Sequence, residues 1–290
     1  MTKPHSFHIP VMGIAFTLDT PLKVGRYGIS SAISIMEDNL LEKMRAKICE
    51  DNALTFVPIS NKEAQYQSKR ITCYLDLLHD LLEKQVKTVK NEPFESDTEI
   101  TKYFELLNRQ SPTYKLYQDM LQTSNVEKKL RLQSELRTKL LPGNIDVNIM
   151  TKLDRVHDAK NGEVVKDGCY SVVALKGFAY SKLHHSSVIL SAGMNPRLFQ
   201  FISDCNAFDP SPSGEFTKRV VIKVSNYRSA LIQVMMLAKK GVWVSEFRVE
   251  SGLNCGGHAF GSDGHLIGPI LEEFKSKKAE LKATLFALLL

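Results

Sequence analysis

The sequence predicts an α/β fold in which buried parallel strands alternate with helices, and three observations support it. Short apolar runs such as Ile29 to Met36 (ISSAISIM) and Arg219 to Val224 (RVVIKV) are typical of buried strands. Helical patterns lie between these runs, as the crossovers of a parallel sheet require. The chain has 290 residues, of which 43% are hydrophobic and 24% charged, and this composition excludes a disordered or fibrous protein.

Six segments are predicted as strands: 8–12, 29–36, 145–150, 187–191, 219–224 and 242–249. An eight-stranded barrel needs two more, and the chain has no room for them. Two alternatives follow, an open sheet of six strands or the front three-quarters of a longer barrel. The apolar ending Leu285–Leu290 favours the longer barrel, because a helix with such an ending needs something to pack against.

Helices are predicted between and after these strands, at 22–27, 171–180, 196–204, 227–240 and from Gly268 to the end. The block 37–143 has a different texture, with apolar residues such as Leu77, Leu78 and Leu81 at helical spacing. We interpret it as a helical insertion after the second strand of one domain, an incomplete barrel that covers 1–290. A separate helical domain is the alternative. The insertion is favoured because both flanks look like strands of one sheet.

Charge and cysteine content exclude several classes of protein. The net charge is +6, but the basic residues are scattered, and Lys128, Lys129 and Arg131 look like a solvated helix face. A nucleic-acid partner is therefore not expected. Five irregularly spaced cysteines indicate a reducing compartment, and no apolar run is long enough to span a membrane. We expect a cytoplasmic protein without a membrane partner that acts on a small molecule, with a homo-oligomer as an open possibility.

The most unusual stretch runs from Glu250 to Gly261 (ESGLNCGGHAFG) and directly follows an apolar strand. It would thus lie at the carboxyl end of the sheet, where α/β proteins bind ligands. Its glycines, Gly256 and Gly257 among them, allow the backbone to approach a ligand closely. His258 on such a loop can exchange a proton near neutral pH. The alternative is a tight connecting loop with an incidental histidine.

Three further side chains are candidates because of their positions. Cys255 is a candidate nucleophile, redox thiol or substrate contact, and with His258 and His265 it falls short of the ligands that a zinc site needs, so no metal is expected. Lys223 ends a strand on the same side and can neutralise an anionic ligand. Arg197 can bind a carboxylate or phosphate of the substrate, although capping of a helix by Asn195 and Pro196 explains that stretch equally well.

The strand before the glycine-rich stretch and the stretch itself resemble a motif of a known family. The segment Gly241–Glu250 followed by Ser251–His258 resembles the Gly-Gly-His signature of the nitronate monooxygenase (2-nitropropane dioxygenase) family, which flavin-dependent enoyl reductases share. The helix that precedes this segment, Ser229–Gly241, is similar to that family's crossover helix. Val147-Asn148 resembles its strand-borne Asn, and Ile9–Gly13 resembles its opening strand. The resemblance covers 1–36 and 145–261 and leaves the block 37–143 unaccounted for.

The resemblance implies a TIM barrel that holds FMN at its carboxyl face. His258 would act as base or proton donor beside the flavin. Asn148 and the backbone at Met12 and Gly13 would line the isoalloxazine, and Gly256-Gly257 would allow its close approach. The chain departs from the family in two ways: Leu253-Asn254-Cys255 lengthens the loop, and the last two strands, which carry the phosphate-binding loops, are not found.

The sequence therefore predicts an FMN-dependent oxidoreductase that oxidises or reduces a small organic substrate, with His258 as the proton-transfer group. A binding or interaction protein on an inert scaffold, with the helical insertion recruiting a partner, is the alternative. An aldolase-type or other phosphate-handling barrel is a third possibility.

Overall fold

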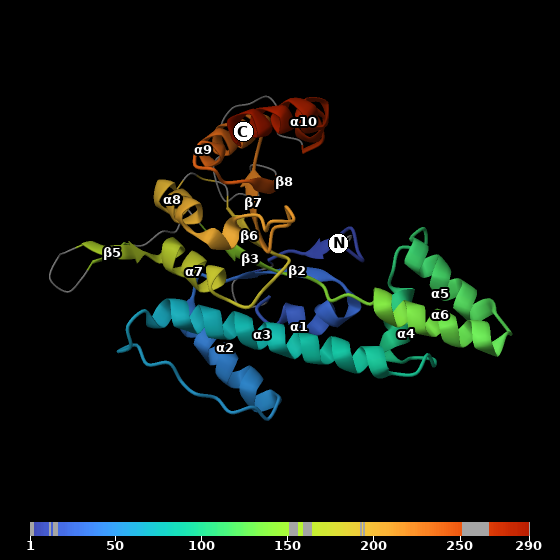
Figure 1. Cartoon of the computed structure of the whole chain (residues 1–290). Helices are drawn as coiled ribbons and strands as arrows, with labels where there is room; N and C mark the ends of the chain where they lie inside the picture. The colour runs from blue at the N-terminus through green and yellow to red at the C-terminus, as the bar shows by residue number, and fades with distance from the viewer. Residues whose placement is uncertain are drawn as a thin grey trace. The chain divides into compact units, whose positions relative to one another are not determined.

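The structure is a computed structural model of the chain (Figure 1). It describes residues 3–11, 13, 17–150, 156–158, 164–191, 193, 195–250 and 267–289.

Among the described residues, six strands form one parallel sheet in the order β1-β2-β3-β6-β7-β8. Two hydrogen bonds, from Ser31 N to Asn144 O and from Ile35 N to Asn148 O, fix β2 and β3 as parallel. The six strands are β1 (His8–Ile9), β2 (Ser30–Ser34), β3 (Ile145–Ile149), β6 (Ser186–Leu190), β7 (Lys218–Val224) and β8 (Val244–Val249).

The strands cross the sheet in chain order. A doubly wound sheet reverses its order at a switch point, whereas a (βα) barrel does not. The chain therefore has an α/β fold with TIM-barrel-like repeats, and the predicted fold class is confirmed. Each predicted strand overlaps an observed one, with ends that differ by several residues in β1 and by one or two residues in most of the others.

One pair of strands was missed. The strands β4 (Val156–Asp158) and β5 (Val164–Cys169) form an antiparallel pair in a stretch where the sequence analysis predicted no strand. The stretch has neither a continuous apolar run nor clean alternation, so no periodicity marks it as a strand.

Helices begin where the local sequence supplies a cap or a proline. The side chains of Ser111, Asn125, Asn195 and Asn226 accept hydrogen bonds from first-turn N–H groups, and Pro21, Pro112 and Pro196 occupy first turns. The helices outside the block 37–143 are α1 (Thr20–Val24), the 3-10 helices η1 (Gly25–Tyr27) and η3 (Asn206–Phe208), α7 (Tyr170–Ala179), α8 (Pro196–Asp204), α9 (Tyr227–Ala238) and α10 (Ile267–Leu289).

The block 37–143 is helical, as predicted. Its described helices are α2 (Asp38–Asp51), α3 (Tyr66–Asn91), α4 (Glu99–Glu105), α5 (Pro112–Gln122) and α6 (Val126–Lys139). The chain divides into two compact units, residues 1–33 with 75–146 and residues 34–74 with 147–290. This division does not follow the predicted ends of the insertion, because α3 contributes to both units.

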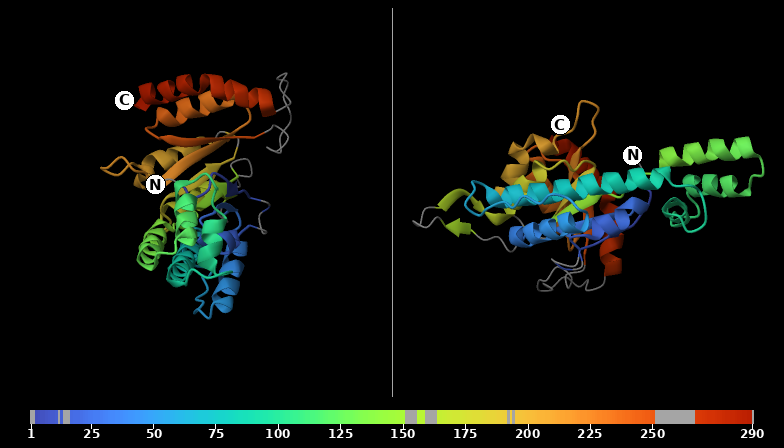
Figure 2. Two further views of the ribbon diagram at one scale, coloured as in Figure 1. Left: turned by 90° about the vertical axis from the view of Figure 1, so that its right-hand side faces the viewer. Right: turned by 90° about the horizontal axis from the view of Figure 1, so that it is seen from below.

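Unit 1 (residues 1–33 and 75–146) has a core of aromatic and aliphatic side chains. Tyr103 and Phe104 of α4 are at most 1% exposed, and Phe104 stacks on Tyr117 of α5 with ring centroids 5.4 Å apart. The helices α5 and α6 pack side by side as an antiparallel pair (Figure 2). Gly143 lies so close to the backbone at Ile29 that an added Cβ would be 2.0 Å from the Ile29 carbonyl oxygen.

Unit 2 (residues 34–74 and 147–290) contains β6, β7 and β8 with the helices that follow them. The helices α9 and α10 lie side by side, and α9 packs on β7 and β8 (Figure 2). Gly177 allows α7 to approach α3 closely, since a Cβ there would be 2.6 Å from the Ile71 side chain. At the end of α7, the Lys218 ammonium donates to the carbonyls of Phe178, Ala179 and Ser181 at 2.6–2.7 Å.

Candidate functional site

The register of the sheet gives it one apolar face and one polar face. On the apolar face, Ile149, Leu190, Ile222 and Phe247 are successive partners across β3, β6, β7 and β8. The other face carries Asn148 on β3 and, beyond the partners Ile189 and Val221, Glu246 on β8. Since Ile35 N donates to Asn148 O, the register places Ser34 beside Asn148 on this polar face. Neighbouring strands lie about 4.8 Å apart.

Two polar groups on this face are buried without a partner. Asn148 is 6% exposed and Ser34 is 1% exposed. Neither the Asn148 Oδ1 atom nor the Ser34 Oγ atom has a hydrogen-bond partner among the described residues. A buried polar atom that lacks a partner costs about 1–3 kcal/mol, so such atoms mark places where a ligand or ordered water can bind. We call Ser34 and Asn148 the polar pair.

Charged side chains line the same face further toward the carboxyl ends of β7 and β8. Lys223 Nζ lies 2.7 Å from Glu250 Oε1, and these side chains are 24% and 25% exposed. Lys223 is also the strand partner of Arg248, whose Nε donates to Glu246 Oε1 at 2.7 Å. We call Lys223, Glu246, Arg248 and Glu250 the ionic rim. It combines two cations with two anions at the edge where α/β proteins bind ligands.

The polar pair and the ionic rim lie on the same face of the sheet, about 10 Å apart. Asn148 and Lys223 are two strands apart, which is about 10 Å across the sheet. Between them lie Ile189 and Val221, each 1% exposed. Along this face the side chains thus run from the polar pair through buried hydrocarbon to the ionic rim.

Two glycines after strands have backbone conformations that favour glycine. Gly13 follows β1 with φ 139° and Gly193 follows β6 with φ 146°. Both stand at the carboxyl ends of their strands. There, a glycine leaves room for the backbone to approach a ligand.

The structure therefore describes only part of the predicted site. Asn148, Lys223 and Gly13 stand at or near the carboxyl ends of strands. Arg197 is exposed in the first turn of α8, where the Asn195 side chain accepts a hydrogen bond from Leu198 N at 3.1 Å, as the capping interpretation predicts. The remaining predicted site residues lie outside the described residues: Met12, Cys255, Gly256, Gly257 and His258.

The sequence interpretation missed several members of the site. Ser34 was treated only as part of the buried strand ISSAISIM, although a hydroxyl in an apolar run can indicate a polar site. Arg248 and Glu250 alternate with Phe247 and Val249 in the last strand, and this alternation marks one polar face.

A second buried network lies in unit 2, beyond the carboxyl end of β2. Asp38 Oδ2 accepts from Arg70 at 2.9 Å and Oδ1 accepts from the Tyr170 hydroxyl at 3.0 Å. Arg70 also donates to Asn39 Oδ1 and the Ile59 carbonyl. Burial, with the Asp38 carboxylate adding to it, raises the pKa of Tyr170. These groups satisfy one another, so we assign the network to structure.

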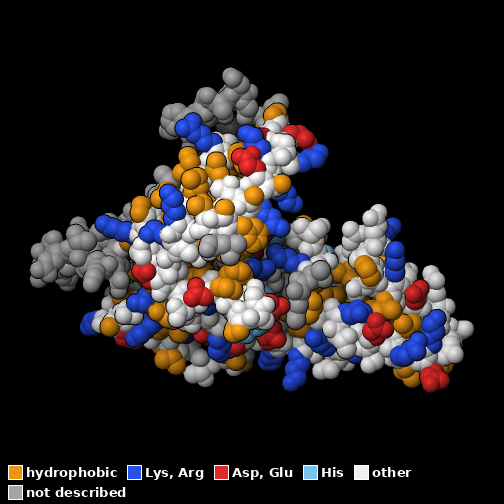
Figure 3. Space-filling model, turned by 45° about the horizontal axis from the view of Figure 1, so that its top comes forward, with side chains coloured by type: hydrophobic (Ala, Val, Ile, Leu, Met, Phe, Trp, Pro, Cys, Tyr) orange, Lys and Arg blue, Asp and Glu red, His pale blue; other side chains and the backbone are white. Residues whose placement is uncertain are grey.

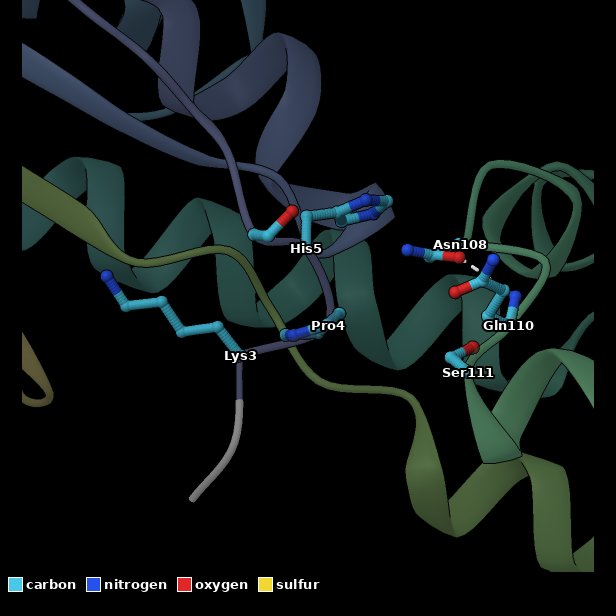
Figure 4. A pocket seen from close by; sticks show the side chains of 7 residues that line it. Lys3, Pro4, His5, Asn108, Gln110 and Ser111 are labelled. Atoms are coloured by element: carbon cyan, nitrogen blue, oxygen red, sulfur yellow. Dashed lines mark hydrogen bonds between the residues drawn. The ribbon is translucent and has the colours of Figure 1, made fainter. Parts of the chain in front are cut away.

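Unit 1 carries a polar surface hollow of about 540 Å³ (Figure 4). His5 faces the loop before α5 across it, and His5 Nε2 lies 3.0 Å from the Tyr27 carbonyl oxygen. Burial lowers the pKa of His5. The hollow has one lysine and no acid, so it offers little for catalysis. It is lined by Lys3, Pro4, His5, Ser6, Asn108, Gln110 and Ser111.

Charge and metal-ligand patterns among the described residues point to no other site. Basic and acidic side chains are interspersed over the face shown in Figure 3. The described residues contain no group of three His, Cys, Asp or Glu side chains that could hold a metal ion. Cys49, Cys73, Cys169 and Cys205 form no disulfide. No helix in the described part of the chain is both long and apolar enough to cross a membrane.

Comparisons of the chain with models of protein families, with curated proteins and with solved structures found no match.

Proposed function

We propose that the chain is an FMN-dependent oxidoreductase resembling nitronate monooxygenase, which oxidises or reduces a small organic substrate. The observation that carries this proposal is the buried Asn148 amide oxygen. It has no partner among the described residues and stands near the carboxyl end of β3. The sequence resemblance independently points to the same side chain.

The described residues fit the ring system of a flavin. The polar face carries an unpartnered acceptor at Asn148, buried hydrocarbon at Ile189 and Val221, and the ion pair of Lys223 with Glu250. The flavin ring combines a polar pyrimidine edge with a broad apolar plane, and these two features match the acceptor at Asn148 and the hydrocarbon at Ile189 and Val221. The described residues provide no cradle for the FMN phosphate, so the proposal rests on the ring.

The chain's own residues would take the following roles. Asn148 would bind the ring edge, and Lys223 would offset negative charge on the flavin or substrate. Met12, Gly13, Gly256 and Gly257 would allow close approach of the backbone. Arg197 and Cys255 would contact the substrate. When bound, FMN supplies two-electron oxidation and reduction, and His258 would hold or move the accompanying proton.

The first experiment asks whether the protein takes up flavin. Purified protein should be yellow, or become so when FMN is added, and acid should release the pigment. Asn148→Leu should weaken FMN binding by at least about tenfold, because the hydrogen bond to the ring is lost. Asn91→Leu, at the exposed end of α3, is the matched control and should bind FMN normally. A colourless protein that does not take up FMN contradicts the proposal.

The second experiment separates catalysis from binding. His258→Ala should keep its flavin and lower turnover of a nitronate substrate by roughly 10²–10⁴-fold, the usual contribution of a positioned acid or base. Loss of flavin in parallel with loss of turnover would assign His258 a structural role instead.

A second candidate function, association through the helical insertion, has one observation in its favour. Leu121 of α5 and Val126 and Leu130 of α6 are 48%, 71% and 62% exposed. An exposed apolar cluster of this kind is typical of interaction surfaces. If the chain forms a homo-oligomer through it, Val126→Glu with Leu130→Glu should lower the sedimentation mass. An unchanged mass, or a monomeric wild type, argues against this candidate.

A further inference from the structure

The polar pair differs from ordinary buried polar groups because its members are neighbours and still do not bond to each other. Ser34 and Asn148 are partners on adjacent strands and face the same side of the sheet. Neighbouring strands of a sheet lie about 4.8 Å apart, so the two side chains start at about that separation. Nevertheless, Ser34 Oγ and Asn148 Oδ1 are both without a hydrogen-bond partner in the described part of the chain.

The chemistry of the two groups restricts what can satisfy both at once. An amide oxygen only accepts hydrogen bonds, whereas a serine hydroxyl can donate one as well as accept. A ligand that bonds to both therefore needs a donor for Asn148 Oδ1, and an acceptor beside that donor would use the Ser34 hydroxyl proton. An N–H group next to a C=O group on one edge meets this requirement.

The neighbouring side chains on this face are apolar. Ile189 follows Asn148 across the sheet, and Val221 follows Ile189. Both are 1% exposed and bring only hydrocarbon to this face. We propose that Ser34 and Asn148 together recognise the adjacent N–H and C=O groups of a planar amide or imide heterocycle. This inference deepens the proposed function and rests on it in so far as the heterocycle is a flavin.

The chain supplies a matched control on the same strand. Ser31 Oγ is also buried, 1% exposed, and unpartnered among the described residues. Ser31 is an odd number of residues from Ser34, so it faces the opposite side of β2. Replacing either serine with alanine removes an unsatisfied hydroxyl of the same kind, and such a change is close to neutral for stability. Only Ser34→Ala should affect binding.

The test uses two pairs of probes, each a parent compound and its methylated form. Lumiflavin and uracil carry N–H groups next to C=O groups, whereas 3-methyllumiflavin and 1,3-dimethyluracil carry no N–H next to a C=O. Wild type should bind each parent compound at least about tenfold more tightly than its methylated form in calorimetric titrations. Ser34→Ala should bind the two parent compounds about tenfold more weakly than wild type does. It should also discriminate less between each parent compound and its methylated form. Ser31→Ala should behave as wild type.

The outcomes separate this inference from the proposed function. Binding of uracil without lumiflavin supports the inference and overturns the flavin proposal. Binding of lumiflavin that neither methylation nor Ser34→Ala weakens supports a flavin protein and overturns the inference. Binding of neither parent compound overturns both, and the polar pair is then satisfied by water.

Discussion

Asp38 and Tyr170 exchange hydrogen bonds across 132 residues of chain. The Asp38 backbone N–H donates to the Tyr170 hydroxyl oxygen at 2.6 Å, and that hydroxyl donates to Asp38 Oδ1 at 3.0 Å. Asp38 begins α2 and Tyr170 begins α7, so one side chain ties together the starts of two helices in unit 2.

Tyr170→Phe should destabilise the protein by about 1–3 kcal/mol. The substitution keeps the ring but leaves the buried Asp38 N–H and one carboxylate oxygen without this partner. Urea denaturation followed by circular dichroism measures the loss. Tyr180→Phe, at a residue that is 66% exposed, is the control. Equal midpoints for the two variants would contradict this account.

Lys218→Met should cost about 1.5–3 kcal/mol of folding free energy. Its ammonium group donates to three carbonyls at the end of α7, and hydrogen bonds from a charged donor are among the stronger ones. Methionine keeps the length and hydrocarbon of the side chain but cannot donate. Lys275→Met, on a side chain that is 77% exposed, should change the free energy of unfolding by less than about 1 kcal/mol in the same urea titration, because exposed ion pairs contribute little.

Stability should fall as the pH drops below about 6.5, in part through His5. Burial lowers the pKa of His5 in the folded protein, so the unfolded chain binds a proton more readily than the folded one. The contribution of His5 to stability is complete above the pKa that His5 has in the unfolded chain. It is lost as the pH falls from that value toward the lower pKa that His5 has in the folded protein. His5→Gln should therefore show a shallower pH dependence of thermal stability than His184→Gln, which changes an exposed histidine. Identical pH profiles would exclude His5 as a cause.

Gly143→Ala should be severely destabilising, by about 3 kcal/mol or more, because the new Cβ would overlap the backbone at Ile29 and that backbone cannot move away as a side chain can. Gly268→Ala provides a contrast of opposite sign. A Cβ at Gly268 meets nothing within 4 Å, and alanine is the better helix former, so this variant should gain up to about 1 kcal/mol. A gain in both variants, measured by differential scanning calorimetry, would show that the approach at Gly143 is looser than described.

The fold was predictable from sequence where burial leaves a simple pattern. Segments such as 219–224 and 187–191 are apolar along their whole length, because strands of a parallel sheet are covered on both faces. The pair β4 and β5 is too short and too polar to produce such a pattern. The division into two units was not predictable either, since it depends on contacts between distant segments that no local periodicity records.

The site was predictable only in part, for a different reason. Asn148 was predicted from the resemblance to a flavoenzyme family, and Lys223 from its place at the end of an apolar strand. Ser34 was not predicted, because serine is small enough to be tolerated in any buried strand. Its significance comes from the register with β3, which places it beside Asn148, and register is a property of the folded sheet.

The path of α3 bears on whether the chain could fold without its helical segment. Residues 66–74 belong to one compact unit and residues 75–91 to the other. Residues 1–33 form one compact unit with residues 75–146, and excision of 37–143 would remove the larger part of that unit. We therefore expect the amino-terminal strand not to fold without the helical segment.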